Sequence, residues 1–173
     1  MFAMAGAPEA HNMLVSNAVG ELRQQFRLRS CRVYPSDMRV RVNSANYTYP
    51  DVVAVCGDRQ FADNRTDTLL NPALLIEVPS PSTEAYDRGR KFEQYKAIQS
   101  LREYLLITSD RIHTDLYTRM ADGRWILTSA DSLEDSLRLE SVDAHLTLAD
   151  LYEKVEFPDS DAVNLPPAPR RTH

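Results

Sequence analysis

This chain of 173 residues contains few cysteines, glycines and lysines. The two cysteines, Cys31 and Cys56, lie inside predicted strands, and their spacing fits neither a zinc site nor a disulfide framework. We therefore expect a reducing compartment and a cytoplasmic protein. No apolar run reaches the roughly 18 residues of a membrane span, and residues 1–7 lack the regions of a signal peptide.

The charge is uneven along the chain. A net charge of −5 argues against a protein that coats nucleic acid generally, although local surfaces can still be basic. Between residues 23 and 41 there is one acidic residue, Asp37, against six arginines. This segment is either a solvated face or a surface that faces phosphate groups. The arginines are Arg23, Arg27, Arg29, Arg32, Arg39 and Arg41.

Hydrophobic periodicity predicts an α/β protein. Residues 43–49 and 57–71 are expected to be loops, and the turn Asp122-Gly123 predicts a hairpin. The order strand, helix, strand over residues 74–108 implies a parallel crossover. The predicted helices span residues 8–29, 84 or 87–100, and 146–152 with Thr147 as cap; the predicted strands span 31–34, 38–42, 50–56, 74–78, 103–108, 112–120, 124–128 and 137–142.

The segment 74–78 combines four apolar residues with one carboxylate, Glu77, and ends at a proline-rich turn. A short apolar run bounded by turn residues is typical of a strand that is buried on both faces. An ionised carboxylate in such a strand costs free energy unless a cation or hydrogen-bond donor meets it. We therefore expect a metal ion or a protein cation beside Glu77. A salt bridge to an arginine, or a strand end that reaches water, would explain it equally well.

Two further residues, Asp51 and Lys91, suggest which charged groups lie beside Glu77. Asp51 begins the predicted strand 50–56, and neighbouring strands can bring Asp51 and Glu77 within reach of one divalent cation, with the Val78 carbonyl as a further oxygen ligand. Asp87, Lys91 and Tyr95 are spaced at i, i+4 and i+8, so they share one face of the following helix. A lysine there can orient or deprotonate an attacking water. The set matches the components of metal-dependent phosphodiester hydrolysis.

Each candidate also has an ordinary structural explanation. Lys91 taken alone fits a solvent-facing lysine, and His11 fits a surface or capping residue better than a ligand. Ser80 and Asp87 either orient the site or cap the helix. Trp125 fits a packing residue better than a stacking platform.

Three segments share a more specific pattern: Tyr49-Pro50-Asp51-Val52-Val53, Glu77-Val78-Pro79-Ser80-Pro81-Ser82-Thr83, and Tyr86-Asp87-Arg88-Gly89-Arg90-Lys91 followed by Tyr95. They resemble the Uma-two branch of the PD-(D/E)XK nuclease superfamily, over roughly residues 4–155. The stretch 77–83 is the specific part of the pattern, whereas Pro50-Asp51 alone is common. Members of the family usually carry a further segment before the point that matches Met1, so the resemblance implies a domain that is N-terminally truncated.

The resemblance implies a restriction-endonuclease-like α/β (α+β) fold, with a mixed central sheet flanked by helices over residues 1–156. The proline-rich, polar composition from Phe157 onward predicts a disordered tail over 157–173. It implies Asp51, Glu77 and Lys91 as catalytic residues, and Asp51, Glu77 and the Val78 carbonyl as ligands of Mg²⁺ or Mn²⁺. The superfamily carries its lysine two residues after the second carboxylate. This chain has Pro79 there, so the resemblance transfers the lysine to Lys91.

The resemblance also places a histidine, His11, near the site, and implies an endonuclease that hydrolyses phosphodiester bonds in DNA. A homodimer is expected because cleavage of a duplex needs two sites. The alternative is a catalytically inactive module on the same fold that binds nucleic acid or another protein, because a fold does not determine a function.

Overall fold

Short apolar runs form the centre of a mixed six-stranded sheet. The computed structural model describes residues 7–157, in which the strand order is β1-β4-β6-β7-β8-β9. β6 and β7 run parallel, as the predicted crossover requires, and the other neighbouring pairs are antiparallel. The strands are β1 (Cys31–Pro35), β4 (Val52–Cys56), β6 (Leu74–Glu77), β7 (Glu103–Ile107), β8 (Thr114–Arg119) and β9 (Trp125–Ala130).

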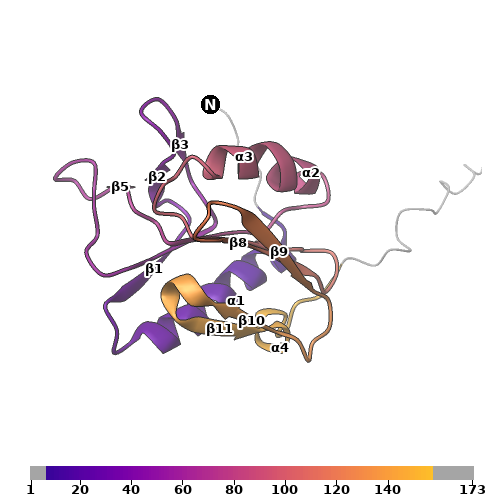
Figure 1. Cartoon of the computed structure of the whole chain (residues 1–173). Helices are drawn as coiled ribbons and strands as arrows, with labels where there is room; N and C mark the ends of the chain where they lie inside the picture. Colours follow the sequence, from indigo (N-terminus) through magenta and orange to yellow (C-terminus); the bar gives the residue numbers. More distant parts are fainter. Residues whose placement is uncertain (1–6, 158–173) are drawn as a thin grey trace, which may run out of the picture.

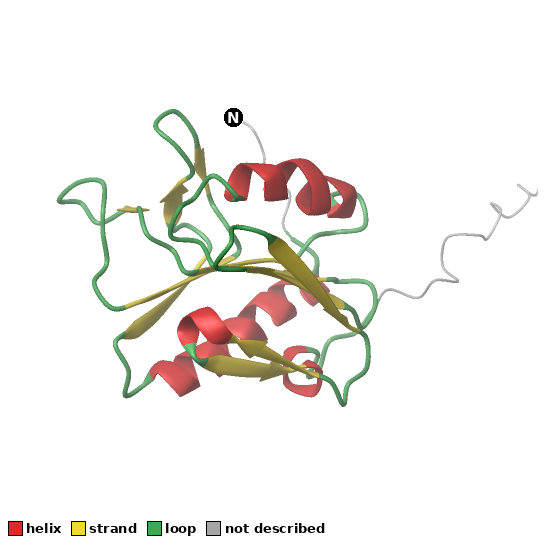
Figure 2. Cartoon of the chain, in the orientation of Figure 1, coloured by secondary structure: helices red, strands yellow, loops and turns green. Residues whose placement is uncertain are grey.

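Helices cover both faces of this sheet, as Figures 1 and 2 show. Helix α1 (Glu9–Phe26) packs on one face through residues spaced four apart, Leu14, Ala18, Leu22 and Phe26, which is the period of one helix face. The opposite face carries one helical segment made of α2 (Glu84–Tyr86), the π-helical turn η1 (Asp87–Lys91) and α3 (Phe92–Tyr95).

Side chains along the central strands point alternately to the two faces of the sheet and pack into two separate hydrophobic cores. On β6, Leu74 and Ile76 face the core under α1, whereas Leu75 faces the core under α3. A strand that is buried on both faces has no polar side, which is why residues 74–76 are continuously apolar. The expected restriction-endonuclease-like architecture, a mixed sheet flanked by helices, is confirmed.

Smaller elements complete the fold. β2 (Arg39–Arg41), β3 (Tyr47–Thr48) and β5 (Thr68–Leu69) form a three-stranded sheet. β10 (Ser136–Leu139) and β11 (Ala144–Thr147) form a hairpin, and the 3-10 turn η2 (Glu140–Val142) joins them. The hairpin packs together with α4 (Leu148–Leu151) in the core under α1. Thr147 caps α4, as predicted, by accepting a hydrogen bond from the Asp150 N–H.

Several predicted boundaries are wrong. The expected loops 43–49 and 57–71 contain β3 and β5, two-residue strands that both pair with β2. Such short strands depend on a partner that lies elsewhere in the chain. The helix predicted to reach residue 100 ends at Tyr95, where carbonyls of the last turn accept bonds from non-helical N–H groups. The helix predicted over 146–152 starts at Leu148, because residues 146 and 147 pair with β10.

The two cysteines require a correction. Cys31 of β1 and Cys56 of β4 lie directly opposite each other in the antiparallel register, and their sulfur atoms form a disulfide. Their separation of 25 residues gives no local signal, because only the pairing of the two strands brings them together. The expectation of a reducing compartment rested on the absence of a disulfide and therefore loses its basis.

Two predictions concern a membrane span and the ends of the chain. Among residues 7–157, no helix is both long and apolar enough to cross a membrane. The tail predicted to be disordered lies outside the described residues, apart from Phe157, and so does the start of the domain predicted over 1–156.

Candidate active site

Strand pairing brings the two predicted carboxylates together. Val52 of β4 is the partner of Ile76 of β6, so continuing the antiparallel register by one residue places Asp51 opposite Glu77. Side chains alternate along a strand, and Val53 and Leu75, each two residues away, both face the α3 core. Asp51 and Glu77 therefore share the face of the sheet that carries the second helical segment.

The helical segment brings Lys91 to the same point. The Lys91 Nζ atom lies 2.9 Å from Glu77 Oε1 and 3.0 Å from Asp87 Oδ1. The Tyr95 hydroxyl donates a second hydrogen bond, of 2.6 Å, to Glu77 Oε1 and lies 2.9 Å from the Thr48 hydroxyl. Glu77 is 4% exposed, so a cation and a phenol replace the water that its carboxylate has lost.

Asp87 and Lys91 are the first and last residues of the π-helical turn. A π turn is wider than an α turn, is rare, and occurs frequently at functional sites. Both side chains point from this turn toward Glu77, so Asp87 holds the ammonium group from one side while Glu77 holds it from the other. Asp87 lies inside the helical segment, whose N-cap residue is Thr83, so it does not cap the helix. Its side chain instead pairs with the Lys91 ammonium.

Asp51 is held by two donors from different elements. Its Oδ1 atom lies 3.2 Å from His11 Nε2, and its Oδ2 atom accepts a 2.8 Å hydrogen bond from the Val78 N–H. The surface or capping role expected for His11 from the residues alone is wrong; its place near the site, which the resemblance implied, is confirmed. His11 Nδ1 is buried and has no hydrogen-bond partner within residues 7–157.

Burial and neighbouring charges shift the pKa values of these groups in different directions. Burial, reinforced by the Asp51 charge, raises the pKa of Glu77 to about 7 against the opposing effect of Lys91. Burial also acts to raise the pKa of Asp51, but the bonds from His11 and Val78 outweigh it and lower the pKa. Burial acts to lower the pKa of Lys91, yet the carboxylates of Glu77 and Asp87 raise it, so the amine stays protonated at neutral pH.

These groups open into one cavity of about 380 Å³. Val78 and Ser80 also line it, and two exposed aromatic residues, Tyr49 and Tyr86, lie at its edge, with 59% and 48% of their surfaces exposed. The Ser80 carbonyl accepts the N–H of Glu84 at the start of α2, so the Ser80 backbone supports the N-terminal end of a helix whose cap residue is Thr83. The catalytic residues predicted from the sequence, Asp51, Glu77 and Lys91, all line this cavity.

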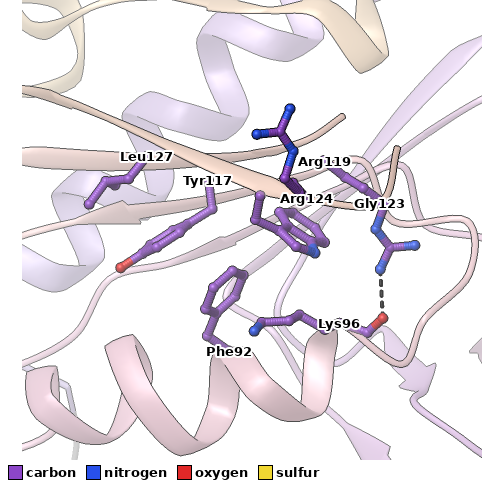
Figure 3. Close-up of a pocket in the computed structure, with 8 residues that line it drawn as sticks. Phe92, Lys96, Tyr117, Arg119, Gly123, Arg124 and Leu127 are labelled. Carbon is purple, nitrogen blue, oxygen red and sulfur yellow. Dashed lines mark hydrogen bonds between the residues drawn. The ribbon is translucent and has the colours of Figure 1, made fainter. Parts of the chain in front are cut away.

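A larger cavity, of about 660 Å³, lies between α3 and the β8–β9 hairpin. Figure 3 shows Phe92 and Lys96 of the helical segment facing Tyr117, Arg119 and their neighbours on the hairpin. Trp125 packs edge-on against Phe92, as expected for a packing residue. None of the predicted catalytic residues lines this cavity, so its size does not mark it as the active site.

Oxygen ligands for a hard cation are present but few. Within residues 7–157 there is no group of three or more His, Cys, Asp or Glu side chains arranged to hold a metal ion. Asp51 and Glu77 nevertheless lie close enough for the Asp51 charge to raise the pKa of Glu77. Together with burial, this charge keeps Glu77 protonated at mildly acidic pH. Mg²⁺ sites need only one or two carboxylates, the remaining ligands being waters and substrate phosphate. The donor set fits such an ion.

The predictions missed the partners of the candidate residues. The i, i+4, i+8 spacing placed Asp87, Lys91 and Tyr95 on one face, but it did not identify the Tyr95 hydroxyl as a donor to Glu77. Nor does any local signal pair Thr48 with Tyr95, because 47 residues separate them. The structure also assigns to the Val78 N–H a hydrogen bond that the sequence did not predict.

Comparisons with known proteins identify the family of this chain. The sequence profile of the Uma2 family, described as "Putative restriction endonuclease", matches residues 1–151. The chain is 33% identical over 158 residues to Uncharacterized protein slr1290 of Synechocystis sp., covering 91% of this chain and 82% of that protein. It is 36% identical over 126 residues to Uncharacterized protein sll1609 of the same organism, covering 72% and 71%.

A solved structure shares the fold. It is a crystal structure from Anabaena variabilis, described as that of "a putative nuclease belonging to DUF820". The TM-score is 0.71 at 16% sequence identity, and the similarity covers 87% of this chain and 84% of that one. Both the profile match and the sequence relatives span most of this chain, and we conclude that the protein belongs to the Uma2 family of restriction-endonuclease-like proteins.

Proposed function

We propose that this protein is an endonuclease that hydrolyses phosphodiester bonds in DNA with the help of Mg²⁺ or Mn²⁺. One observation carries the proposal: two opposed carboxylates, Asp51 and Glu77, and a protonated amine, Lys91, line a single cavity. The membership of a nuclease family supports the general class of activity. We propose Asp51, Glu77 and the Val78 carbonyl as ligands of the cation, and the oxygen-only donor set favours a hard ion.

A divalent cation bound there would supply positive charge for the phosphoryl oxygens and a bound water of lowered pKa. The residues of the chain prepare the site. His11 and the Val78 N–H hold Asp51 in one orientation and keep it ionised. Lys91 stays protonated, so its role is to donate hydrogen bonds to a phosphoryl oxygen and to offset developing charge, not to remove a proton from water.

The decisive experiment combines cleavage with metal binding. The wild-type protein should cut a DNA duplex only when Mg²⁺ or Mn²⁺ is added, and calorimetry should detect binding of the ion without DNA. Asp51→Asn and Glu77→Gln should each abolish both signals while the circular dichroism spectrum is unchanged. Asp122→Asn, which alters an exposed carboxylate outside the cavity, is the matched control. Cleavage by both active-site variants would refute the assignment.

A second candidate is a catalytically inactive module on the same fold. One observation favours it: Lys91 already pairs with Glu77 and Asp87, and His11 bonds to Asp51, so each carboxylate of the cavity has a partner within the protein without a metal ion. This candidate expects DNA binding that is unaffected by Mg²⁺, with no calorimetric signal for Mg²⁺ or Mn²⁺ at millimolar concentration. The calorimetric experiment therefore separates the two functions even when no cleavage is seen.

A further inference from the structure

The structure separates five of the six arginines of residues 23–41 into two groups. Arg41, the sixth, is exposed on β2 and lines a different cavity, so it belongs to neither group. Arg29 lies 3.6 Å from a carboxylate oxygen of Asp143, and Arg39 donates to Asp67 and Thr68. These arginines have acidic partners within the protein. They therefore account for part of the basic segment as ordinary surface ion pairs, in agreement with the explanation of a solvated face.

The other group consists of Arg23, Arg27 and Arg32, which we call the arginine cluster. All three are exposed, and none forms an ion pair with a carboxylate in the described part of the chain. They line one cavity of about 430 Å³ together with Phe26, Cys31 and Val33, and no acidic residue contributes to that lining. The only side-chain hydrogen bond of the cluster within residues 7–157 is from Arg32 to the Cys31 carbonyl.

A structural role at the helix end accounts for only part of this cluster. Arg23 and Arg27 lie at the C-terminal end of α1, where a cation is stabilised by about 0.3–1 kcal/mol through the helix dipole. Arg32 lies on β1, beyond the helix, and gains nothing from that dipole. Three like charges on one surface repel one another, so an external anion is the partner that would relieve the repulsion.

The cluster lies at a defined distance from the active site. Helix α1 carries His11, which lies beside the active site, in its first turn. Arg23 follows twelve residues later, which at the α-helical rise is roughly 18 Å. Asp51 directly precedes β4, and Val55, four residues further along, is the partner of Arg32; this separation is roughly 13 Å. Figure 1 shows α1 running along the sheet, with its C-terminal end turning into β1. The two estimates agree that the cluster lies about 13–18 Å from the active site.

We propose that the arginine cluster binds the phosphate backbone of duplex DNA beside the cleavage point. The proposal rests on the proposed nuclease function, because the occupant is the substrate of the same protein. One base pair adds about 3.4 Å to a duplex, so the contacted phosphates lie roughly four to five base pairs from the scissile bond. Arginine suits this role because its planar donors match a phosphate group.

Binding should be measured first, without cleavage. A fluorescent duplex of about 20 base pairs, titrated in EDTA at about 50–200 mM NaCl, gives the affinity and its salt dependence by anisotropy. The variant R23Q/R27Q/R32Q should lose at least about tenfold in affinity, and its salt slope should fall by up to about 3. The charge-conserving variant R23K/R27K/R32K should keep most of the affinity.

The matched control removes the same charge elsewhere. R65Q/R124Q/R138Q also changes three arginines, each of which already pairs with a neighbouring carboxylate. It should retain more affinity than the cluster variant. Equal affinities and equal salt slopes in the two triple variants would overturn the proposal. R32Q alone, on a strand and away from the helix, repeats the comparison with a single change and replaces the triple variant if that variant does not fold.

The length of the substrate gives a second readout. With Mg²⁺, KM should fall by about tenfold or more once the duplex extends roughly five base pairs beyond the scissile bond, and the cluster variant should lose this length dependence. Length dependence that survives in the variant contradicts the proposal but leaves the nuclease function intact. Arginine-dependent duplex binding without any cleavage supports the cluster and refutes the nuclease function. A change of oligomeric state with unchanged DNA affinity overturns the cluster as a DNA site.

Discussion

Two buried glutamates lie on neighbouring parallel strands, Glu77 at the end of β6 and Glu103 at the start of β7. Glu77 is 4% exposed and Glu103 is 1% exposed. Glu103 accepts hydrogen bonds from the backbone N–H groups of Glu140 and Ser141, both at 3.0 Å, and from the Ser141 hydroxyl. It therefore holds the η2 turn against the start of the central strand β7 and does not line the cavity.

Glu77 has the opposite environment. Its partners are an ammonium group and a phenol, a second carboxylate faces it, and its side chain opens into a cavity. Burial, which the like charge of Asp51 reinforces, raises the pKa of Glu77. The comparison teaches that burial alone does not identify a functional carboxylate. The charged groups around it and its access to a cavity do.

The largest effect should come from Lys91→Met. The change leaves Glu77 and Asp87 buried without their ammonium group, and we expect a loss of about a hundred- to a thousandfold in kcat. Stability should fall by about 2 kcal/mol, less than for a fully buried pair because the Lys91 side chain is 19% exposed. Cleavage assays and urea unfolding measure both. The control Lys96→Met disrupts an exposed ion pair with Glu93 and should change neither quantity appreciably.

The second largest effect should be the pH dependence of the free energy of unfolding. The pKa of Glu77 is about 7 in the folded protein against an ordinary value of 4.5, so between these values the unfolded chain releases a proton that the folded protein keeps. The free energy of unfolding therefore falls as pH rises through this window, by at most about 3 kcal/mol, and levels off above it. Urea unfolding in EDTA from acidic to mildly basic pH measures this slope.

Two variants isolate the contribution of Glu77. Glu77→Gln should flatten the slope and should be more stable than the wild type at mildly basic pH, since Asp87 still pairs with Lys91. His11, whose pKa is raised by its bond to Asp51, adds a smaller loss of stability as pH rises further, and this loss should survive in the variant. An unchanged slope in Glu77→Gln would show that the raised pKa belongs to another group.

Glu103→Gln tests the other side of the comparison. The amide keeps the shape of the side chain but weakens the hydrogen bonds from the η2 turn, so we expect a loss of about 1–3 kcal/mol in stability. The rate of cleavage per folded molecule should stay within about twofold of the wild type, because Glu103 does not reach the cavity. Loss of activity without loss of stability would contradict the division between the two glutamates.

The smallest effect should come from Tyr95→Phe, which removes a single hydroxyl from Glu77 and Thr48. We expect a loss of about 1 kcal/mol in stability and a further rise in the pKa of Glu77, seen as a shift of the pH profile of stability to higher pH. Tyr117→Phe is the control, since its hydroxyl makes no hydrogen bond within residues 7–157 and its ring packs in the same aromatic core. An equal effect of both changes would show that the Tyr95 hydroxyl does not influence Glu77.

Much of the site could be predicted because its signals are local. The apolar strand interrupted by Glu77, the aspartate at the start of β4 and the helical spacing of Asp87 and Lys91 are all visible within short windows. Contacts between distant segments could not be predicted in the same way. The disulfide of Cys31, the bond of His11 to Asp51 and the pairing of β5 with β2 all depend on the arrangement of the strands and α1.

The sequence by itself determined the mixed α/β class, the strands that hold Asp51 and Glu77, and the helix that follows them, because alternation and helical periodicity act between near neighbours. Only the tertiary structure decided which buried glutamate meets a cavity and which arginines lack an acidic partner. Both properties depend on charges that lie far apart in the chain. Electrostatic free energy follows distance in space and access to water, and neither is encoded in the spacing of residues along the sequence.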